Sequence, residues 1–327
     1  MSRADDPRWM WEDYWQSGHL ACCLADDLRA GYDGPLASHW RSVFQDMPDG
    51  ARILDLATGN GGVAMIAADV AAMTGRHFTV TGVDLARIDP ARHAPQCRDR
   101  LAAITFQGGV DVTDLPMPDA SVDLVVSQFG VEYAPLDRAL DQALRVLAPG
   151  GRLHCVLHAG NGRAEQAAER DLALLDTITR MPLHANLRRA LDAVTTLRRD
   201  GGAACQAAAD EAVHAFIESL EALNGLLAHY PNHGTIMTLG RKLMALFEAQ
   251  ESEPPASLMP KIDASEKALT ALAARLSMLR DAALSADDMR TVKARLEGHG
   301  CHVSARPLLH PEGGDTLAWT LNALPAG

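Results

Sequence analysis

Three acidic side chains follow apolar runs of the chain and could bind a polar ligand. Asp55 stands in LDLATGNGG (54–62), Asp84 ends the run FTVTGVD, and Asp111 follows a shorter third run. A carboxylate can accept charge-assisted hydrogen bonds from both hydroxyls of a ribose, which suits Asp84, and Asp111 could accept from an adenine amino group. Asp55 would repel a pyrophosphate and attract a cation. The three acids together favour a nucleoside ligand with a cationic part.

Gly59 and Gly61 permit a sharp turn and a close approach of a ligand to the backbone. The spacing Gly59-x-Gly61-x-x-Ala64 also matches the dinucleotide fingerprint, so an NAD-dependent oxidoreductase is an open alternative. That alternative has no obvious Tyr-x-x-x-Lys or metal constellation to support it. Each residue also has a purely structural interpretation, with the glycines in a tight turn, Asp84 as a helix cap and Asp111 in a turn. Three acids at three successive strand ends fit that interpretation poorly.

Alternating strand-like and helical segments must position these residues. Apolar, β-branched runs predict strands, and spacings of three and four predict helices at about 62–73 and 136–147. The predicted strands are 51–56, 78–84, 104–106, 122–127 and 152–158. Strands separated by helices indicate an α/β fold with a doubly wound parallel sheet covered on both faces, which binds ligands at the carboxyl ends of its strands.

The pattern changes to helix after helix at about 163–284. Within it, Leu258 to Leu279 form a heptad-like seam that could pair two subunits. A helix capped by Ser285 and strands at 302–309 and 316–321 follow. The sequence therefore predicts a helical lid at 1–48, a cofactor-binding domain at 49–160 and 285–327, and an all-helical insertion or cap at 161–284.

Four motifs in register resemble those of the class I S-adenosylmethionine-dependent methyltransferases. They are LDLATGNG (54–61), TGVDLA (81–86), VDVTDLPMPDASVDLVVSQFGVEY (110–133) and RVLAPGGRLHCV (145–156). The resemblance implies a Rossmann-like, mostly parallel seven-stranded sheet ending in an antiparallel strand, with a helical insertion after the fifth strand. It implies S-adenosyl-L-methionine as cofactor, with the ribose on Asp84. The other implied contacts are the methionine part with the loop of Asp55, Ala57, Thr58, Gly59 and Gly61, adenine with Leu85, Asp111 and Val112, and the sulfonium and methionyl groups with Ser127 and Gln128.

A methyl acceptor with an oxygen or amine must lose a proton, which favours a nearby general base. Glu132, just after the fourth strand, and His158, at the end of the fifth, are the candidates. Their structural alternatives are a solvated helix-start acid and a packing histidine. Transfer to O or N of a small apolar or aromatic metabolite is expected, with carbon less favoured. A cofactor-binding protein without turnover is a further alternative.

The amino-terminal segment Trp9–Trp15 holds three of the chain's five tryptophans. Aromatic faces can cover a cation and exclude water, so the segment could be a lid, with Tyr14 contacting the cofactor, or an amphipathic helix packed on the sheet. Adjacent Cys22 and Cys23 suggest a soft-metal or arsenic site or, more simply, ordinary helix positions. The arsenite methyltransferases place their cysteines at spacings that this chain lacks.

Composition narrows the classes of partner for the 327-residue chain. Thirty basic and 42 acidic residues give a net charge of −12, which opposes binding to nucleic acid or an anionic membrane. The region 122–133, at and after the fourth predicted strand, also lacks an Asn-Pro-Pro-Tyr-type motif, which disfavours methylation of nucleic acid. Six scattered cysteines indicate no metal site or disulfide framework, and a cytoplasmic location is expected because no signal peptide or membrane-length apolar run is evident. The expected partners are a small-molecule methyl acceptor and a second copy of the chain.

Overall fold

The computed structural model describes residues 8–24, 27–311 and 313–326. It divides the chain into two compact units, which are described separately. Unit 1 comprises the residues up to Glu169 and those from Arg275 onward, and unit 2 comprises Arg170–Ala274. Residues 1–7 of the predicted lid lie outside the described residues.

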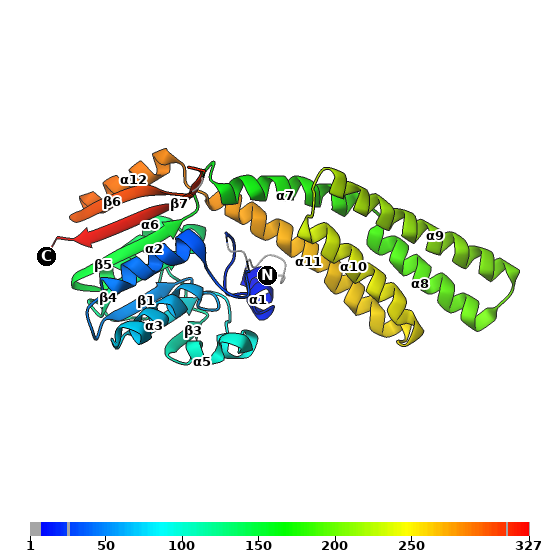
Figure 1. Cartoon of the computed structure of the whole chain (residues 1–327), viewed down its shortest axis with the longest axis horizontal. Coiled ribbons are helices and arrows are strands. Elements are labelled where there is room, and N and C mark those ends of the chain that lie inside the picture. Colours follow the sequence, from blue (N-terminus) through cyan, green and yellow to red (C-terminus); the bar gives the residue numbers. More distant parts are fainter. Residues whose placement is uncertain (1–7, 25–26, 312, 327) are drawn as a thin grey trace. The chain divides into compact units, whose positions relative to one another are not determined.

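Unit 1 is built on one sheet of seven strands in the order β3-β2-β1-β4-β5-β7-β6 (Figure 1). Strands β1 to β5 pair in parallel, whereas β7 runs antiparallel to both β5 and β6. The α/β fold with seven strands is confirmed, and the sheet is mixed rather than purely parallel. Its strands are β1 (Arg52–Leu56), β2 (Thr79–Asp84), β3 (Ile104–Gly108), β4 (Val122–Gln128), β5 (Leu147–Leu157), β6 (Cys301–Leu309) and β7 (Thr316–Pro325).

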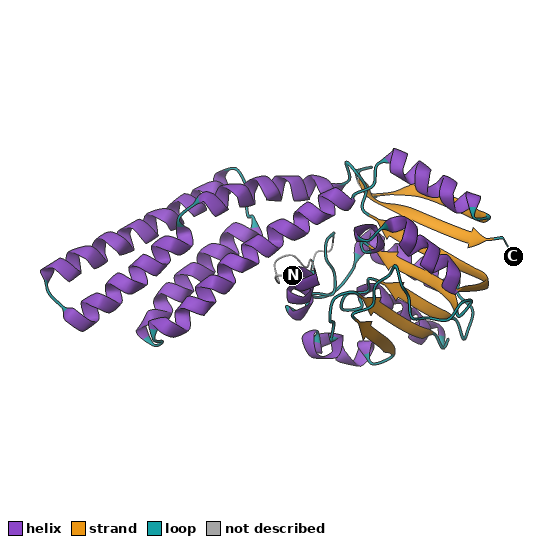
Figure 2. Ribbon diagram, turned by 180° about the vertical axis from the view of Figure 1, so that it is seen from behind, coloured by secondary structure: helices purple, strands orange, loops and turns teal. Residues whose placement is uncertain are grey.

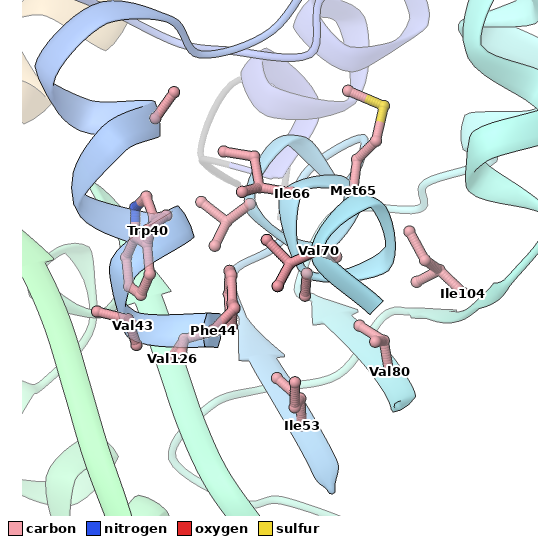
Figure 3. Close-up of a cluster of buried hydrophobic side chains, with 14 of the residues drawn as sticks. Trp40, Val43, Phe44, Ile53, Met65, Ile66, Val70, Val80, Ile104 and Val126 are labelled. Atoms are coloured by element: carbon pink, nitrogen blue, oxygen red, sulfur yellow. The ribbon is translucent and has the colours of Figure 1, made fainter. Parts of the chain in front are cut away.

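Helices cover both faces of the sheet because its strands are apolar on both sides (Figure 2). Ile53 and Leu54, neighbours on β1, belong to the cores on opposite faces. On one face lie α2 (Gly34–Gln45) and α3 (Gly62–Thr74), whose side chains pack on β1, β2 and β4 as Figure 3 shows. On the other face lie α6 (Leu136–Val146) and α12 (Ala286–Gly298).

The remaining helices of unit 1 are short. They are α1 (Arg8–Gln16), α4 (Pro90–His93) and α5 (Arg98–Leu101), with single 3-10 turns at Pro95–Cys97 and Val131–Tyr133. Helix α12 begins as the sequence predicts: the Ser285 hydroxyl accepts from the backbone N–H of Asp288, whose carboxylate accepts from the Ser285 N–H. This reciprocal capping box satisfies two donors that the helix itself leaves unpaired.

Between β5 and α12 the described chain is helical. The helices are α7 (Arg163–Arg180), α8 (Leu183–Asp200), α9 (Ala203–Gly225), α10 (Gly234–Glu248) and α11 (Pro255–Ala282), with 3-10 turns at Leu226–Ala228 and Ala249–Glu251. Unit 2 is shorter than the predicted insertion of 161–284. Both ends of that segment belong to unit 1, where Ala164, Ala168, Leu276 and Leu279 form a cluster with Leu24 and Tyr133.

The predicted leucine seam lies on α11, and part of it is covered within a single chain. Leu258 and Ile262 are fully buried, and the polar member Ser265 is 2% exposed. An apolar stripe that is already buried offers little further surface to a second subunit. None of the helices that the structure describes is both long and apolar enough to cross a membrane.

Substituting Phe44 tests the packing of α2 on the sheet. Phe44 is fully buried and stacks on Trp40, with ring centroids 5.7 Å apart. We expect Phe44→Ala to lower the free energy of unfolding of unit 1 by about 3–5 kcal/mol, because it leaves a cavity in the core. Urea unfolding followed by tryptophan fluorescence measures this directly, since all five tryptophans belong to unit 1.

Met73→Ala is the matched control for this prediction. Met73 lies on α3 and is 80% exposed, so its truncation should change the unfolding free energy by less than about 0.5 kcal/mol. Equal losses in the two variants would show that α2 does not contribute a packed core side chain at Phe44.

Candidate functional site

A cavity of about 220 Å³ opens at the carboxyl ends of β1, β2 and β4. Its wall includes five of the predicted cofactor residues, which lie at or just after the ends of β1, β2 and β3, and aromatic side chains from α1 and from the segment after β4. The lining residues are Arg8, Trp11, Trp15, Ala57, Asp84, Leu85, Ala86, Asp111, Val112, Phe129, Gly130, Tyr133, Ala134, Pro135 and Met278.

The glycine loop after β1 forms one side of this region. Gly59 and Gly61 adopt positive φ angles of +54° and +86°, and Gly61 is the amino-terminal cap of α3. A Cβ at Gly59 would lie 2.4 Å from a ring carbon of Trp15, and one at Gly61 would lie 2.6 Å from the ring of Phe106. Glycine is therefore required both by the turn and by the aromatic rings that cover it.

Asp84 joins β2 to the glycine loop. One carboxylate oxygen, Oδ2, accepts from the backbone N–H of Gly59 at 2.8 Å, and Oδ1 accepts from that of Ala86 at 2.8 Å. Burial raises the pKa of Asp84 to about 6, against the two backbone hydrogen bonds that lower it. Each carboxylate oxygen can accept a second hydrogen bond, so a ligand with two adjacent hydroxyls can still bind there.

A second, smaller cavity shares wall residues with the first, and the start of the glycine loop after β1 forms part of its wall. Asp55, Thr58 and Gln128 line it, together with Cys22 and Tyr32. The Asp55 carboxylate accepts from the Thr58 hydroxyl at 2.6 Å, and burial raises its pKa to about 7. Ala57 and Trp15 line both cavities.

Gln128 leaves one buried donor without a partner. Its Oε1 accepts from the indole N–H of Trp40, a residue of the core of unit 1. Its Nε2 has no hydrogen-bond partner among the described residues, although the side chain is only 6% exposed. Because an unpaired buried donor is costly, this nitrogen marks a place where a ligand acceptor would be stabilising.

Asp111 and Val112 border the first cavity after β3. The Asp111 Oδ1 accepts from the backbone N–H and the hydroxyl of Thr113, both at 2.8 Å, and these bonds lower the Asp111 pKa. No hydrogen bond within the described chain occupies Asp111 Oδ2, so it can accept from a ligand. Val112 is buried in the cavity wall, and Leu85 is 41% exposed beside it.

Ser127 does not line either cavity. Its hydroxyl donates to the Leu56 carbonyl at 2.9 Å and accepts from the Val131 N–H at 3.3 Å. Ser127 therefore holds the end of β4 against β1, which positions the neighbouring Gln128.

Glu132, a predicted base, connects two loops instead of facing a cavity. Its two carboxylate oxygens accept from the backbone N–H groups of Gly130 and His158, at 2.8 and 2.9 Å. The side chain is 7% exposed, and burial raises its pKa to about 7. In this conformation the carboxylate stabilises the turn after β4 and the end of β5.

His158, the other predicted base, is fully buried and contacts Tyr133, which lines the cavity. Its ring stacks on Phe129 with centroids 4.2 Å apart, and its Nε2 lies 3.1 Å from the Tyr133 hydroxyl. Burial lowers the pKa of His158 to about 3, so the imidazole is neutral at pH 7. Tyr133, not His158, reaches the cavity wall.

Helix α1 supplies the predicted aromatic segment. Trp11 and Trp15 line the first cavity, but Tyr14 does not. Its hydroxyl donates to the Ala21 carbonyl at 2.6 Å, and its ring packs on Trp15 and His19. The predicted cofactor contact of Tyr14 would therefore need a rearrangement of this ring.

Cys22 and Cys23 carry free thiols whose sulfur atoms are 3.7 Å apart. Hydrogen bonds from Cys23 and Tyr32 lower the pKa of the Cys22 thiol. Within the described part of the chain, no group of three or more His, Cys, Asp and Glu side chains is arranged to hold a metal ion.

Sequence patterns missed several residues of the cavity wall, among them Phe129, Ala86 and Met278. Phe129 has a φ of +52°, unusual for an aromatic residue, and follows β4 directly. Ala86 contributes a backbone N–H, and Met278 comes from α11, almost two hundred residues after Asp84 in the chain. The segment Gln128-Phe129-Gly130 belongs to one of the four motifs and could have indicated Phe129, whereas Met278 belongs to no motif.

Comparison with known proteins assigns the domain that contains this site. Residues 53–151 match the family model of a methyltransferase domain. The ubiquinone/menaquinone biosynthesis C-methyltransferase UbiE of Methylobacterium nodulans is 38% identical over 107 residues, which are 32% of this chain and 41% of that protein. The demethylmenaquinone methyltransferase of Thermus thermophilus is 38% identical over 103 residues, which are 31% of this chain and 44% of that protein. The chain thus spans less than half the length of these curated relatives.

Solved structures of S-adenosylmethionine-dependent methyltransferases are also similar to parts of the chain. The one from Mesorhizobium loti is 26% identical with a TM-score of 0.31, over 38% of this chain and 55% of that one. The one from Aquifex aeolicus is 19% identical with a TM-score of 0.31, over 37% and 64%.

The matched residues 53–151 contain all of β1 except Arg52, β2 to β4, the glycine loop, Asp84 and Asp111. This is the part of the chain whose four motifs resemble the class I enzymes. Residues 53–151 are therefore similar to a methyltransferase domain, in agreement with the resemblance of the four motifs to the class I S-adenosylmethionine-dependent methyltransferases.

Proposed function

We propose that this protein transfers a methyl group from S-adenosylmethionine to a small aromatic acceptor. The observation that supports this most strongly is the position of Asp84. Its carboxylate is part of the cavity wall and is hydrogen-bonded to the glycine loop. Both oxygens can accept from a ribose, and the acids on either side of it suit adenine and a cationic amino-acid tail.

The residues that line the two cavities suit the two ends of this cofactor, and the second cavity, at about 20 Å³, must widen to admit the methionyl part. In the first, Asp84 would accept from the ribose hydroxyls, while Leu85, Asp111 and Val112 would border the adenine. In the second, Gln128 Nε2 lacks a partner and could donate to the methionyl carboxylate, and Asp55 would attract the ammonium group. The buried carboxylate of Asp55, beside the glycine loop, would oppose the pyrophosphate of NAD, which makes an oxidoreductase the weaker candidate.

When bound, S-adenosylmethionine supplies an electrophilic methyl group on a sulfonium and leaves as S-adenosylhomocysteine. The chain's own contribution is to position the two partners and to exclude water. Trp11, Trp15 and Tyr133 surround the cavity, and the Trp11 ring lies 5.5 Å from that of Tyr133. Aromatic faces attract a cation without competing as nucleophiles, so this lining suits a sulfonium.

The acceptor atom is proposed from the relatives and from the site. Both relatives described above act on quinones or their precursors by name, and one is named a C-methyltransferase. We therefore favour a ring carbon over the oxygen or nitrogen that the sequence suggests. Methylation of a ring carbon requires an electron-rich ring and the loss of a proton.

The Tyr133–His158 pair lies closest to the proposed acceptor, because Tyr133 lines the cavity and its hydroxyl is 3.1 Å from His158 Nε2. Burial lowers the pKa of His158 to about 3, so this imidazole is a weak base, and the proposed role of the pair is to orient the acceptor rather than to take its proton. Glu132 has a pKa of about 7, but its carboxylate oxygens already accept two backbone hydrogen bonds. We propose for Glu132 a positioning role.

Removing the Asp84 charge should abolish most cofactor affinity. We expect Asp84→Asn to weaken binding of S-adenosylhomocysteine at least tenfold and up to a thousandfold, since each lost charge-assisted hydrogen bond contributes about 1.5–3 kcal/mol. Isothermal titration calorimetry with S-adenosylhomocysteine, S-adenosylmethionine and NAD measures the effect.

Asp119→Asn is the matched control for Asp84→Asn, because Asp119 pairs with Arg145 at the surface and its side chain is 77% exposed. Binding of the control should equal that of the wild type. If NAD alone bound the wild type, the methyltransferase proposal would be wrong.

Cofactor affinity should rise with pH. A ribose that donates to Asp84 favours the ionised carboxylate, and the pKa of this group in the free protein is about 6. Ionisation of Asp84 alone should therefore make the affinity for S-adenosylhomocysteine roughly tenfold weaker at pH 5 than at pH 7.5. Asp55, with a pKa of about 7, adds a further loss in the same direction, so the total change in the wild type should exceed tenfold.

Titrations of the wild type and of Asp84→Asn across this pH range separate the two carboxylates. The variant should lose the step near pH 6 and keep the one near pH 7. A wild-type affinity that is constant from pH 5 to 7.5 would contradict a ribose on Asp84.

A further inference from the structure

Arg275 is a partly buried cation without an anionic partner. It lies near the carboxyl end of α11, in the part of that helix that belongs to unit 1. Its guanidinium lies over the ring of Tyr14, 4.7 Å from the ring centroid. No acidic side chain of the described residues forms an ion pair with it.

Other half-buried arginines have oxygen partners: Arg145 and Arg295 pair with carboxylates, whereas Arg76 and Arg152 donate to backbone carbonyls. Arg145 pairs with Asp119 at 2.6 Å, and Arg295 pairs with Asp141 at 2.8 Å. The side chains of both arginines are about one third exposed. Arg275 differs from them because its guanidinium packs on an aromatic ring, that of Tyr14, rather than pairing with a carboxylate.

The groups that surround Arg275 do not replace a carboxylate. Burial lowers the pKa of Arg275, and Tyr14, Asp13, Cys22 and Tyr133 partly offset this. Burial raises the pKa values of both tyrosines, so they are neutral at pH 7, and Asp13 is exposed to solvent. The Tyr14 hydroxyl already donates to the Ala21 carbonyl. Most of the guanidinium's five donors are therefore available to a ligand.

Arg275 also lies beside the cavity described above. Met278, one turn further along α11, is part of the cavity wall, and so is Tyr133. Trp11 packs on Tyr14 and on Tyr133, with ring centroids 6.0 and 5.5 Å away. A planar ring that contacts Trp11 and Tyr133 would thus have a cation close to its edge.

We propose that the methyl acceptor is a planar aromatic anion, a phenolate, enolate or carboxylate, whose charged oxygen binds the Arg275 guanidinium. The planar fork of an arginine matches oxygen anions, and such a pair gains strength where water is excluded. A deprotonated oxygen also makes its ring a better carbon nucleophile. The inference rests on the proposed function for the identity of the acceptor, but the binding of the anion is testable without methyl transfer.

A matched pair of probes tests the charge preference: 2-naphthoate, an anion at pH 7, and 2-naphthamide, which has the same ring system and no charge. Calorimetric titration of each probe into the full-length wild type, with and without saturating S-adenosylhomocysteine, gives the preference. We expect 2-naphthoate to bind at least tenfold more tightly than 2-naphthamide.

Two arginine variants locate the effect. Arg275→Gln should remove the preference for 2-naphthoate and leave S-adenosylhomocysteine affinity within about twofold of the wild type. Arg280→Gln removes the same charge from the same helix at an exposed position paired with Asp281, and should keep the preference. The wild-type comparison remains decisive if Arg275→Gln does not fold.

Equal binding of the two probes, or no binding of either, in the wild type would overturn the proposal, as would a preference that survives in Arg275→Gln. Loss of the preference in Arg280→Gln as well would also overturn it, because the effect would then be one of net charge. Absence of S-adenosylhomocysteine binding in the wild type contradicts the proposed function instead, and the probe titrations without it still decide whether Arg275 binds an anion.

Discussion

The hydrogen bond from the Gly59 backbone to the Asp84 carboxylate is the interaction on which the site depends. It fixes the glycine loop after β1 to the end of β2, so two parallel strands and the start of α3 present one continuous wall. The same carboxylate must remain able to accept from a ligand. A buried acid with a pKa of about 6 meets both needs near neutral pH, where it is mostly ionised.

Much of the fold follows from local patterns in the chain. The β-branched runs before Asp84 and before Gln128 form β2 and β4 because their side chains are buried on both faces of the sheet. The start of β5 is less predictable. Turn-forming Pro149, Gly150 and Gly151 lie inside this strand, because a register shift in its pairing with β4 accommodates them.

The acids of the site were predictable for the same reason, since parallel strands bring their carboxyl ends to one edge. The partners of the buried groups were not. Nothing local indicates that Trp15 covers Gly59, that Glu132 holds the backbone of His158, or that Arg275 lies over Tyr14. These contacts join residues far apart in the chain, and they arise from tertiary packing. Tyr133 rather than His158 lines the cavity, and Glu132 accepts from the backbone of two loops, while the catalytic roles of Glu132 and His158 stay predictions.

A crystal structure of the protein with S-adenosylhomocysteine tests the central claim most directly. The account predicts both ribose hydroxyls within hydrogen-bond distance of the Asp84 carboxylate, the adenine beside Asp111 and Val112, and the methionyl carboxylate on Gln128 Nε2. A ribose bound away from Asp84, or a ligand outside the two cavities at the carboxyl ends of β1, β2 and β4, would contradict it.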